Sequence, residues 1–269
     1  MSLREIRDVR VVALLGNDSQ HRNTLATLIK NDVNVVGVCI AESKKRGLPL
    51  DYIIRSFSRR GFLTTVSQML ARIVYLAVNQ RLDRKLEAEI FNDKENCKII
   101  TDFSPLIVID KSFSLQKEFI SRLEPEILVV HTGSWVGRDV RGINTVKYVI
   151  GGHPGITPFY RGAHSPFWAI FNGDEMKVGW TCFLLDQGVD TGPVLEQGLL
   201  IPNHEETYFS LSWRGVKEIA LSQVNAIRMF AVKGKINSTA HKFIPENSEY
   251  FVPTLSQQIR YWLKQSKVK

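Results

Sequence analysis

The sequence lacks the marks of a membrane-spanning, secreted or zinc-binding protein. Its longest purely apolar stretch in the helical middle, Ile73 to Val78, is far shorter than the roughly 20 residues that cross a bilayer, so no transmembrane segment is expected. The N-terminus turns polar at residues 16–18 before a secretory core develops, which predicts a cytoplasmic protein. No C-x-x-C spacing occurs, which favours buried reduced thiols and no metal at Cys39, Cys97 and Cys182.

The first loop also lacks the second glycine of a dinucleotide-binding fingerprint. It follows a β-branched run over residues 9–15 and precedes a helical pattern with Leu25, Leu28 and Ile29, then a strand-like run over 33–42. The order strand, helix, strand predicts a right-handed βαβ unit. We therefore expect an α/β fold with a doubly wound, mostly parallel sheet, and the missing glycine disfavours a nicotinamide enzyme.

A basic helical insertion interrupts this alternation at about residues 44–98. Residues 50–92 repeat apolar side chains at intervals of three and four, namely Phe62, Val66, Met69, Leu70, Ile73, Leu76 and Ala77. Bases outnumber acids by five between Glu42 and Lys98, within a formal net charge of +8 for the chain. The apolar face is expected to pack on the domain or on a second subunit, with docking on an anionic membrane surface as the alternative.

Strand and helix patterns resume after the insertion. The residues predict strands over 106–110, 125–133, 146–150, 178–186 and 194–201, and helices over 112–123, 164–172 and 205–232. Serine 112 would cap the first of these helices, and SQQIRYWL predicts a last helix in the polar tail. We divide the chain into a core over residues 1–235 and a short C-terminal extension over 236–269, without internal repeats.

A histidine stands just past the expected strand 146–150, in GGHPGITPFYRG. His153 has a reference pKa near 6.5, which suits a positioned acid or base. Pro154 and Pro158 stiffen the chain around it, and ligands of open α/β sheets bind at the carboxyl ends of strands. A single histidine in a turn is more often structural, so the residue alone leaves both interpretations open.

The stretch LLDQGVDTGPV is a second candidate for chemistry. Asp186 and Asp190 lie four apart, with glycines between and after them, which is the composition of a turn. Two acids in a loop can be solvated, can cap backbone groups or can act on a ligand. The triplet DTG also occurs in aspartic proteases, but one copy in an α/β chain disfavours that class.

These stretches together resemble the folate-dependent formyltransferases, the family that includes methionyl-tRNA, glycinamide-ribonucleotide and amino-sugar formyltransferases. HPGITPFYRG, FWAIFNGD and GWTCFLLDQGVDTG follow the family's N-x-H-x-S-L-L-P-x-x-R-G and D-x-G-x-D-x-G motifs in order and spacing. The resemblance runs from about Val11 to Leu200, with EPEILVVHTGSW similar to the strand and loop beside the folate pocket. It implies a Rossmann-like formyltransferase core that moves a formyl group from 10-formyltetrahydrofolate to a primary amine without a metal.

The resemblance also implies roles for individual residues. His153 would donate a hydrogen bond to the oxyanion that forms during formyl transfer, and Asp190 would orient His153 and help to move the amine proton. The loop from Asp186 to Asp190 would line the pterin. Further folate contacts are implied for Ser134, Trp135, Val136, Gly155, Ile156, Thr157 and Pro158.

Gly151 departs from the family motif. It stands where the family has asparagine, two residues before the histidine, and it has no side chain to donate. A non-catalytic or altered folate-binding relative is therefore one alternative to an enzyme. A formyltetrahydrofolate hydrolase, with water as the acceptor, is another that uses the same residues.

The expected acceptor is a small-molecule amine on a sugar or nucleotide-linked sugar. The GITPFYRG form of the motif and the basic insertion look most like formyltransferases of polysaccharide biosynthesis. About 35 residues follow the long helix, too few for the barrel with which methionyl-tRNA formyltransferases hold tRNA, so tRNA is a disfavoured alternative. The first loop has polar groups that could hold phosphate at a helix N-terminus, yet the missing glycine argues against glycinamide ribonucleotide. The oligomeric state stays open.

Overall fold

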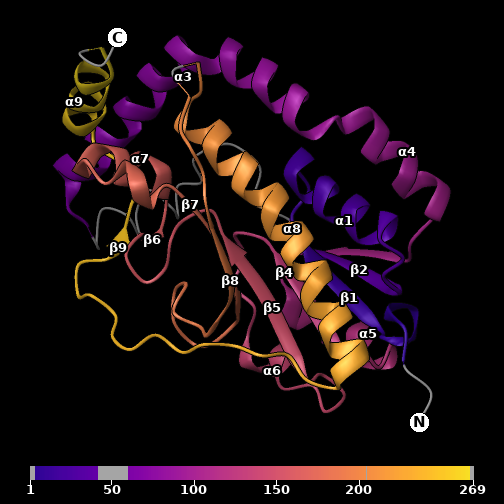
Figure 1. Cartoon of the computed structure of the whole chain (residues 1–269). Helices are drawn as coiled ribbons and strands as arrows, with labels where there is room; N and C mark the ends of the chain where they lie inside the picture. Colours follow the sequence, from indigo (N-terminus) through magenta and orange to yellow (C-terminus); the bar gives the residue numbers. More distant parts are fainter. Residues whose placement is uncertain (1–3, 42–59, 204, 267–269) are drawn as a thin grey trace.

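A seven-stranded sheet forms the centre of the protein (Figure 1). The computed structural model describes residues 4–41, 60–203 and 205–266. The strands lie in the order β3-β2-β1-β4-β5-β7-β8, with bounds Val11–Leu15 for β1, Val35–Ala41 for β2, Ile107–Asp110 for β3, Ile127–His131 for β4, Tyr148–His153 for β5, Gly179–Leu184 for β7 and Val194–Leu199 for β8. The first five strands in this order are parallel, whereas β7 pairs antiparallel with β5 and β8 pairs antiparallel with β7. The predicted doubly wound, mostly parallel sheet is confirmed.

Strand β1 shows why this sequence forms a two-sided sheet. All five of its residues are buried, and their side chains alternate between two hydrophobic clusters on opposite faces. Val11, Ala13 and Leu15 join the first cluster, and the intervening Val12 and Leu14 join the second. A strand covered on both faces reads as a continuous apolar run, which is how it appears in the sequence.

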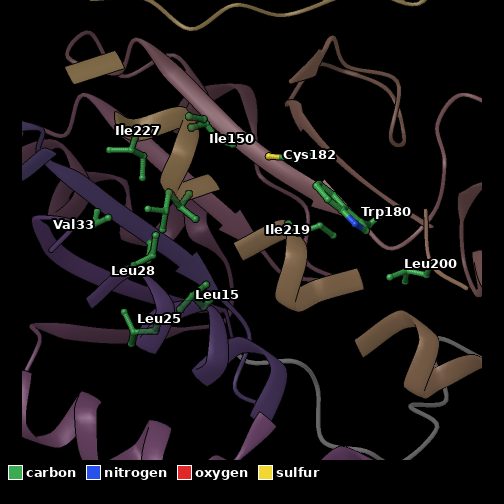
Figure 2. Close-up of a cluster of buried hydrophobic side chains, with 14 of the residues drawn as sticks. Leu15, Leu25, Leu28, Val33, Ile150, Trp180, Cys182, Leu200, Ile219 and Ile227 are labelled. Carbon is green, nitrogen blue, oxygen red and sulfur yellow. The ribbon is translucent and has the colours of Figure 1, made fainter. Parts of the chain in front are cut away.

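Helices cover both faces of the sheet. Helices α1 (Ser19–Lys30) and α8 (Tyr208–Lys233) lie over the first cluster, where Leu25, Leu28, Ile219 and Ile227 belong to the same cluster as Ile150 of β5 (Figure 2). On the other face lie α6 (Arg138–Arg141) and the pair made of the 3-10 turn Phe113–Gln116 and α5 (Lys117–Arg122). That pair replaces the single helix predicted over 112–123, and the Ser112 side chain makes no cap hydrogen bond.

The long helix α8 begins and ends at local signals. The Thr207 side chain accepts a hydrogen bond from Ser210 N at 3.1 Å, and the helix stops at Gly234, whose φ of 68° few other residues adopt. The predicted helix over 205–232 is therefore confirmed with its start shifted to Tyr208. The short helix α7 (Ser165–Asn172) is also present, and β6 (Arg161–Gly162) pairs with β9 (Glu249–Tyr250) beside it.

The predicted insertion is a long helix that arches over one side of the molecule (Figure 1). Helix α3 (Phe62–Phe91) is followed by α4 (Asp93–Phe103), whereas residues 42–59 of the insertion lie outside the described residues. Helix α3 packs against α8 and against α9 (Leu255–Ser266), the last helix that the sequence predicted. Among the described residues, α3 is long and apolar enough to cross a membrane by length and composition alone, and 22% of its apolar window is buried.

The cysteines follow the sequence prediction at two positions of three. Cys39 in β2 and Cys182 in β7 are free and buried, and burial raises the pKa of each thiol to about 12. Cys97 is exposed, so the expectation of burial was wrong there. It lies on α4, which packs against α1, and it lines a small pocket with Arg22 and Leu25 of α1.

Candidate active site

A pocket of about 610 Å³ opens at the carboxyl ends of β4 and β5. This is the edge at which open α/β sheets bind ligands. Its walls come from the strand ends, from the loop after β4 and from the loop between β7 and β8. Among the residues that line it are Gln20, His21, His131, Ser134, Trp135, Val136, Gly151, His153, Leu185, Asp186 and Asp190.

His153 and Asp190 meet in this pocket. His153 is the last residue of β5, and its Nδ1 lies 3.3 Å from Asp190 Oδ2. Both side chains are largely buried, with 7% and 20% of their surface exposed. Asp190 has a φ of 53°, and its Oδ2 also accepts a hydrogen bond from Gly162 N at 2.9 Å. Residues 37 apart in the sequence are thus brought together by the return of β7 alongside β5.

The second ring nitrogen of His153 faces the protein interior. Nε2 lies 2.7 Å from Ser165 Oγ and 3.0 Å from the Tyr160 carbonyl oxygen. Ser165 Oγ in turn donates to the same carbonyl at 3.2 Å. The Tyr160 carbonyl and the Asp190 carboxylate both accept hydrogen bonds. Each ring nitrogen of His153 therefore has an acceptor beside it. Both His153 and Asp190 line the pocket, so a ligand there would meet the pair.

Asp186 shapes its own loop. Its Oδ1 accepts hydrogen bonds from Gly188 N at 3.0 Å and from Thr191 Oγ1 at 2.7 Å, and Arg141 donates to its main-chain oxygen at 2.7 Å. This is an Asx turn of the kind that Asp-Gly-rich sequences favour. The turn presents Gly188, Val189 and Asp190 to the pocket.

The expected folate-binding residues divide into two groups. Ser134, Trp135 and Val136 line the pocket, and Trp135 is 63% exposed. Residues 155–158 do not line it, because the turn after His153 folds behind the strand end. Thr157 is buried there, its N donates to Thr181 Oγ1 at 3.1 Å, and its carbonyl accepts from Gln197 Nε2 at 2.7 Å. Folate contact by Gly155, Ile156, Thr157 and Pro158 stays a prediction that this geometry does not support.

The position of the missing asparagine is filled from the neighbouring strand. Gly151 lines the pocket, and a Cβ atom placed on it would overlap Leu185 Cδ1. Leu185, whose N donates to the Val149 carbonyl at 2.8 Å, thus occupies the space beside Gly151. The glycine and the leucine form a matched pair, so the motif lost its polar group and gained an apolar wall.

Two further histidines, His21 and His131, line the pocket, and the second was missed in the sequence. His131 ends β4 as His153 ends β5, so the rule that located His153 would have found it. Its Nδ1 lies 2.7 Å from Thr24 Oγ1, and its ring centroid lies 4.7 Å from that of His21. Burial lowers the pKa of His21 to about 4 and that of His131 to about 3, so both rings are neutral at pH 7.

The N-terminus of α1 is not built for phosphate. Asp18 N donates to His21 Nδ1 at 3.0 Å in a capping box, and the Ser19 hydroxyl contacts the Glu87 carboxylate of α3. Arg22 is engaged by Asp93 through two hydrogen bonds of 2.7 Å. The carboxylates of Glu87 and Asp93 therefore engage the groups that an anion would need as hydrogen-bond donors. In the described ranges, no group of three or more His, Cys, Asp or Glu side chains could hold a metal ion.

Comparison with known proteins addresses the resemblance directly. Residues 143–219, which hold His153, Ser165 and Asp190, match the family model described as formyl transferase. The resemblance to the formyltransferases is confirmed. The matched formyl transferase segment begins just before β5 and ends within α8, so it covers the edge of the sheet where the candidate site lies.

Curated relatives share part of the chain. It is 33% identical over 107 residues to a methionyl-tRNA formyltransferase of Pelotomaculum thermopropionicum, covering 39% of this chain and 32% of that protein. It is 31% identical over 106 residues to a GDP-perosamine N-formyltransferase of Brucella melitensis, covering 39% and 40%. The chain thus matches less than half the length of either relative.

Solved structures support the fold over a longer range. The phosphoribosylglycinamide formyltransferase of Anaplasma phagocytophilum superposes with a TM-score of 0.55 at 15% identity, covering 88% of this chain and 97% of that one. At such low identity the likeness concerns the fold alone. The sheet and its flanking helices are therefore arranged as in a known formyltransferase, beyond the matched segment.

Proposed function

We propose that this chain transfers a formyl group from 10-formyltetrahydrofolate to a primary amine. The contact between His153 Nδ1 and Asp190 Oδ2 at the end of β5 carries the proposal. The pair lies inside the formyl transferase segment and at the edge of the sheet that binds ligands. A one-carbon transferase is the activity that the match to the formyl transferase model supports.

The pocket fits a folate in size and chemistry. Its volume of about 610 Å³ lies within the roughly 300–1,000 Å³ of small-molecule sites. Its walls combine Val136, Phe183 and Leu185 with backbone of the loops after β4 and β7. A flat heterocycle that carries several hydrogen-bonding atoms needs both kinds of surface. The bound co-substrate would supply an activated formyl group. The residues of this chain would position the two reactants and move the proton between them.

The two side chains divide the work. The amine nitrogen forms a bond to the formyl carbon while the bond from that carbon to its carrier nitrogen breaks. The imidazole of His153, oriented by Asp190, donates to the formyl oxygen as that oxygen gains negative charge, which typically lowers a barrier by about 3 kcal/mol. Asp190 accepts the proton that the amine loses and passes it to the leaving nitrogen. Ser165 and the Tyr160 carbonyl hold the His153 ring through Nε2.

An amino sugar or nucleotide-linked amino sugar is the acceptor that we favour. The name of the GDP-perosamine N-formyltransferase of Brucella melitensis indicates that this relative acts on such a molecule. The acidic surroundings of the α1 N-terminus disfavour a ribonucleotide whose phosphate binds there. Methionyl-tRNA is the second candidate, because a methionyl-tRNA formyltransferase is equally similar over the same length.

Gly151 keeps a third possibility in view, an altered relative that binds folate without transfer. Leu185 beside Gly151 removes the space in which an asparagine would act. Formyl transfer would then depend on His153 and Asp190 alone. A hydrolase would release formate from the same pair with water as the acceptor.

A single assay separates these functions. Purified protein is mixed with 10-formyltetrahydrofolate and, in turn, amino sugars, nucleotide-linked amino sugars, methionyl-tRNA or no amine. Release of tetrahydrofolate only with a sugar amine supports the proposal. Turnover with methionyl-tRNA alone assigns the second candidate, and formate without an amine indicates a hydrolase. Folate binding without any turnover would overturn the transferase.

A further inference from the structure

The first half of α3 exposes apolar side chains on the side that faces away from the rest of the described residues. Phe62, Leu63, Leu70 and Ile73 have 64%, 82%, 45% and 61% of their surface exposed. At 3.6 residues per turn, all four fall on one stripe of the helix, together with Val66 and Ala77. A soluble helix normally places polar residues there.

The opposite stripe of α3 is already covered by protein. Thr65, Gln68, Ala71 and Tyr75 are buried, and Gln68 Nε2 donates to the Val252 carbonyl at 2.6 Å. Tyr75 packs against the rings of Tyr208 and Phe209 of α8. Because one face is sealed on α8 and α9, α3 lies on the molecule as a surface helix instead of crossing a bilayer.

An apolar pocket of about 360 Å³ lies beside this helix. Met69 and Leu76 of α3 form one wall, and Phe209, Val252 and Pro253 form others. His164 lies at its inner end, and the two residues before His164, Gly162 and Ala163, line the candidate active site. A hydrocarbon chain entering here would therefore end close to the catalytic pocket.

Two acids of α3 contact neighbouring segments of the protein, whereas two of its arginines are exposed. Asp83 faces inward, where the hydroxyls of Thr207 and Tyr75 donate to it at 2.7 and 3.1 Å, and Glu87 contacts Ser19. Arg81 and Arg84 are exposed and continue the outward stripe into the second half of the helix. The outward face thus passes from aliphatic to cationic. Beside it, α9 exposes Ile259 and Leu263 next to Arg260 and Lys264.

A second copy of the chain would cover this stripe poorly. Sixteen residues of helix make a ridge roughly 24 Å long and about 10 Å wide, well below the ~800 Å² per partner of a standard interface. Two chains of net charge +8 would also bring Arg81 and Arg84 of both copies together. A fluid anionic surface accepts a single convex ridge and attracts its arginines.

We propose that the protein docks on an anionic lipid surface through the outward stripe of α3, and that it formylates amines carried on a lipid. The first part stands on the exposure and charge of α3 and α9. The second part rests on the proposed formyl transfer, with the apolar pocket taking the hydrocarbon chain next to the acceptor amine.

Vesicle flotation tests the docking. The full chain should float with vesicles of equal parts phosphatidylcholine and phosphatidylglycerol, and much less with phosphatidylcholine alone. The double variant Leu63→Glu, Ile73→Glu should lose at least tenfold in partitioning, because two apolar side chains become charged. Both side chains are solvent-exposed in the free protein, so the fold should not depend on them. The pair Arg81→Gln, Arg84→Gln should lose about fivefold per arginine at low salt and show a weaker salt dependence.

Matched controls decide whether the stripe is specific. Met176 and Ile201 are 80% and 85% exposed elsewhere on the surface, so Met176→Glu, Ile201→Glu should bind vesicles like the parent. Equal losses in both double variants, or no flotation of the parent, would overturn the docking. So would a dimer that dissociates in the α3 double variant while the parent ignores vesicles.

Turnover separates the two parts of the proposal. One amino sugar is offered free in solution and also joined to an acyl chain in the same anionic vesicles. Faster formylation of the vesicle-bound amine, lost in the α3 double variant, supports the lipid-carried acceptor. Equal rates for both amines would refute that acceptor and leave formyl transfer standing. Formylation of neither, with flotation intact, would refute formyl transfer and leave the docking standing.

Discussion

The edge of the sheet at β5 and the outer face of α3 depart from ordinary burial in opposite directions. At the edge, His153 and Asp190 are polar and largely enclosed, whereas on α3 Leu63 and Ile73 are aliphatic and largely exposed. Each departure is held by ordinary packing behind it, the sheet core in one case and Tyr75 against α8 in the other. In both regions the unusual burial of the side chains indicates where a ligand or a partner surface would bind.

The largest expected effect lies at the enclosed pair. Asp190→Asn keeps the size of the side chain but removes its charge, so formyl transfer should fall on the order of 10³-fold as proton acceptance and orientation of His153 are lost. Initial rates of tetrahydrofolate release measure this. Glu196→Gln, an exposed carboxylate on β8, is the matched control and should leave the rate unchanged. A rate for Asp190→Asn within tenfold of the parent would remove this residue from the chemistry.

The two faces of α3 should differ strongly in stability. Tyr75→Ala removes a buried ring and the hydroxyl that donates to Asp83, and should lower the free energy of unfolding by about 3–4 kcal/mol. Leu70→Ala, on the outward stripe, should change it by less than about 0.5 kcal/mol. Urea unfolding of both variants provides the comparison. Similar losses in the two would mean that the outward face is packed against protein after all.

The Gly151 and Leu185 pair offers a smaller, coupled effect. Gly151→Asn forces a side chain against Leu185 and should cost about 1–3 kcal/mol of unfolding free energy. Leu185→Ala should relieve that overlap, so the double variant should be more stable than the sum of the two single changes predicts. Denaturant melts of the four proteins form the cycle. Strict additivity would show that the leucine does not occupy the asparagine position.

Mild acid should destabilise the folded protein through three buried histidines. Burial lowers the pKa values of His21 and His164 to about 4 and of His131 to about 3, against about 6.5 in the unfolded chain. Between these values the unfolded state binds more protons, so stability falls as the pH falls from about 6.5 to 4, by at most about 1.4 kcal/mol per pH unit for each histidine.

A carboxylate of the protein acts in a separate pH window. The Arg4 guanidinium holds the pKa of Glu126 at about 2, so the stabilisation from that pair is lost only below about pH 4.5. Unfolding free energies at pH 7.0 and 5.0 therefore report on the histidines without a contribution from Glu126. His164→Asn should reduce the pH dependence of the unfolding free energy by the contribution of one histidine. An unchanged pH dependence would show that His164 is not held neutral by the fold.

Much of the fold was predictable because its signals are local. The apolar run at Val11–Leu15, the cap before α8 and Gly234 after it are written in neighbouring residues. The histidine at the end of β5 followed from the same pattern, and the motifs on either side of it predicted the family. His131 was equally accessible to that rule and was overlooked.

Other features depend on which segments meet. Thr157 lies seven residues before His164 in a single motif, yet the turn carries it behind the strand while His164 reaches the apolar pocket. Leu185 fills the place beside Gly151 only because β7 returns antiparallel to β5. Neither contact has a signal in the spacing of residues.

The sequence by itself determined the parallel sheet, the position of His153 at a strand end and the apolar repeat of α3, because periodicity and turn chemistry act over a few residues. Only the tertiary structure decided that Asp190 meets Nδ1 of His153, that Glu87 shields the start of α1, and that the described part of the chain covers just one face of α3. These outcomes depend on packing between segments far apart in the chain, where burial and charge are set by the neighbour.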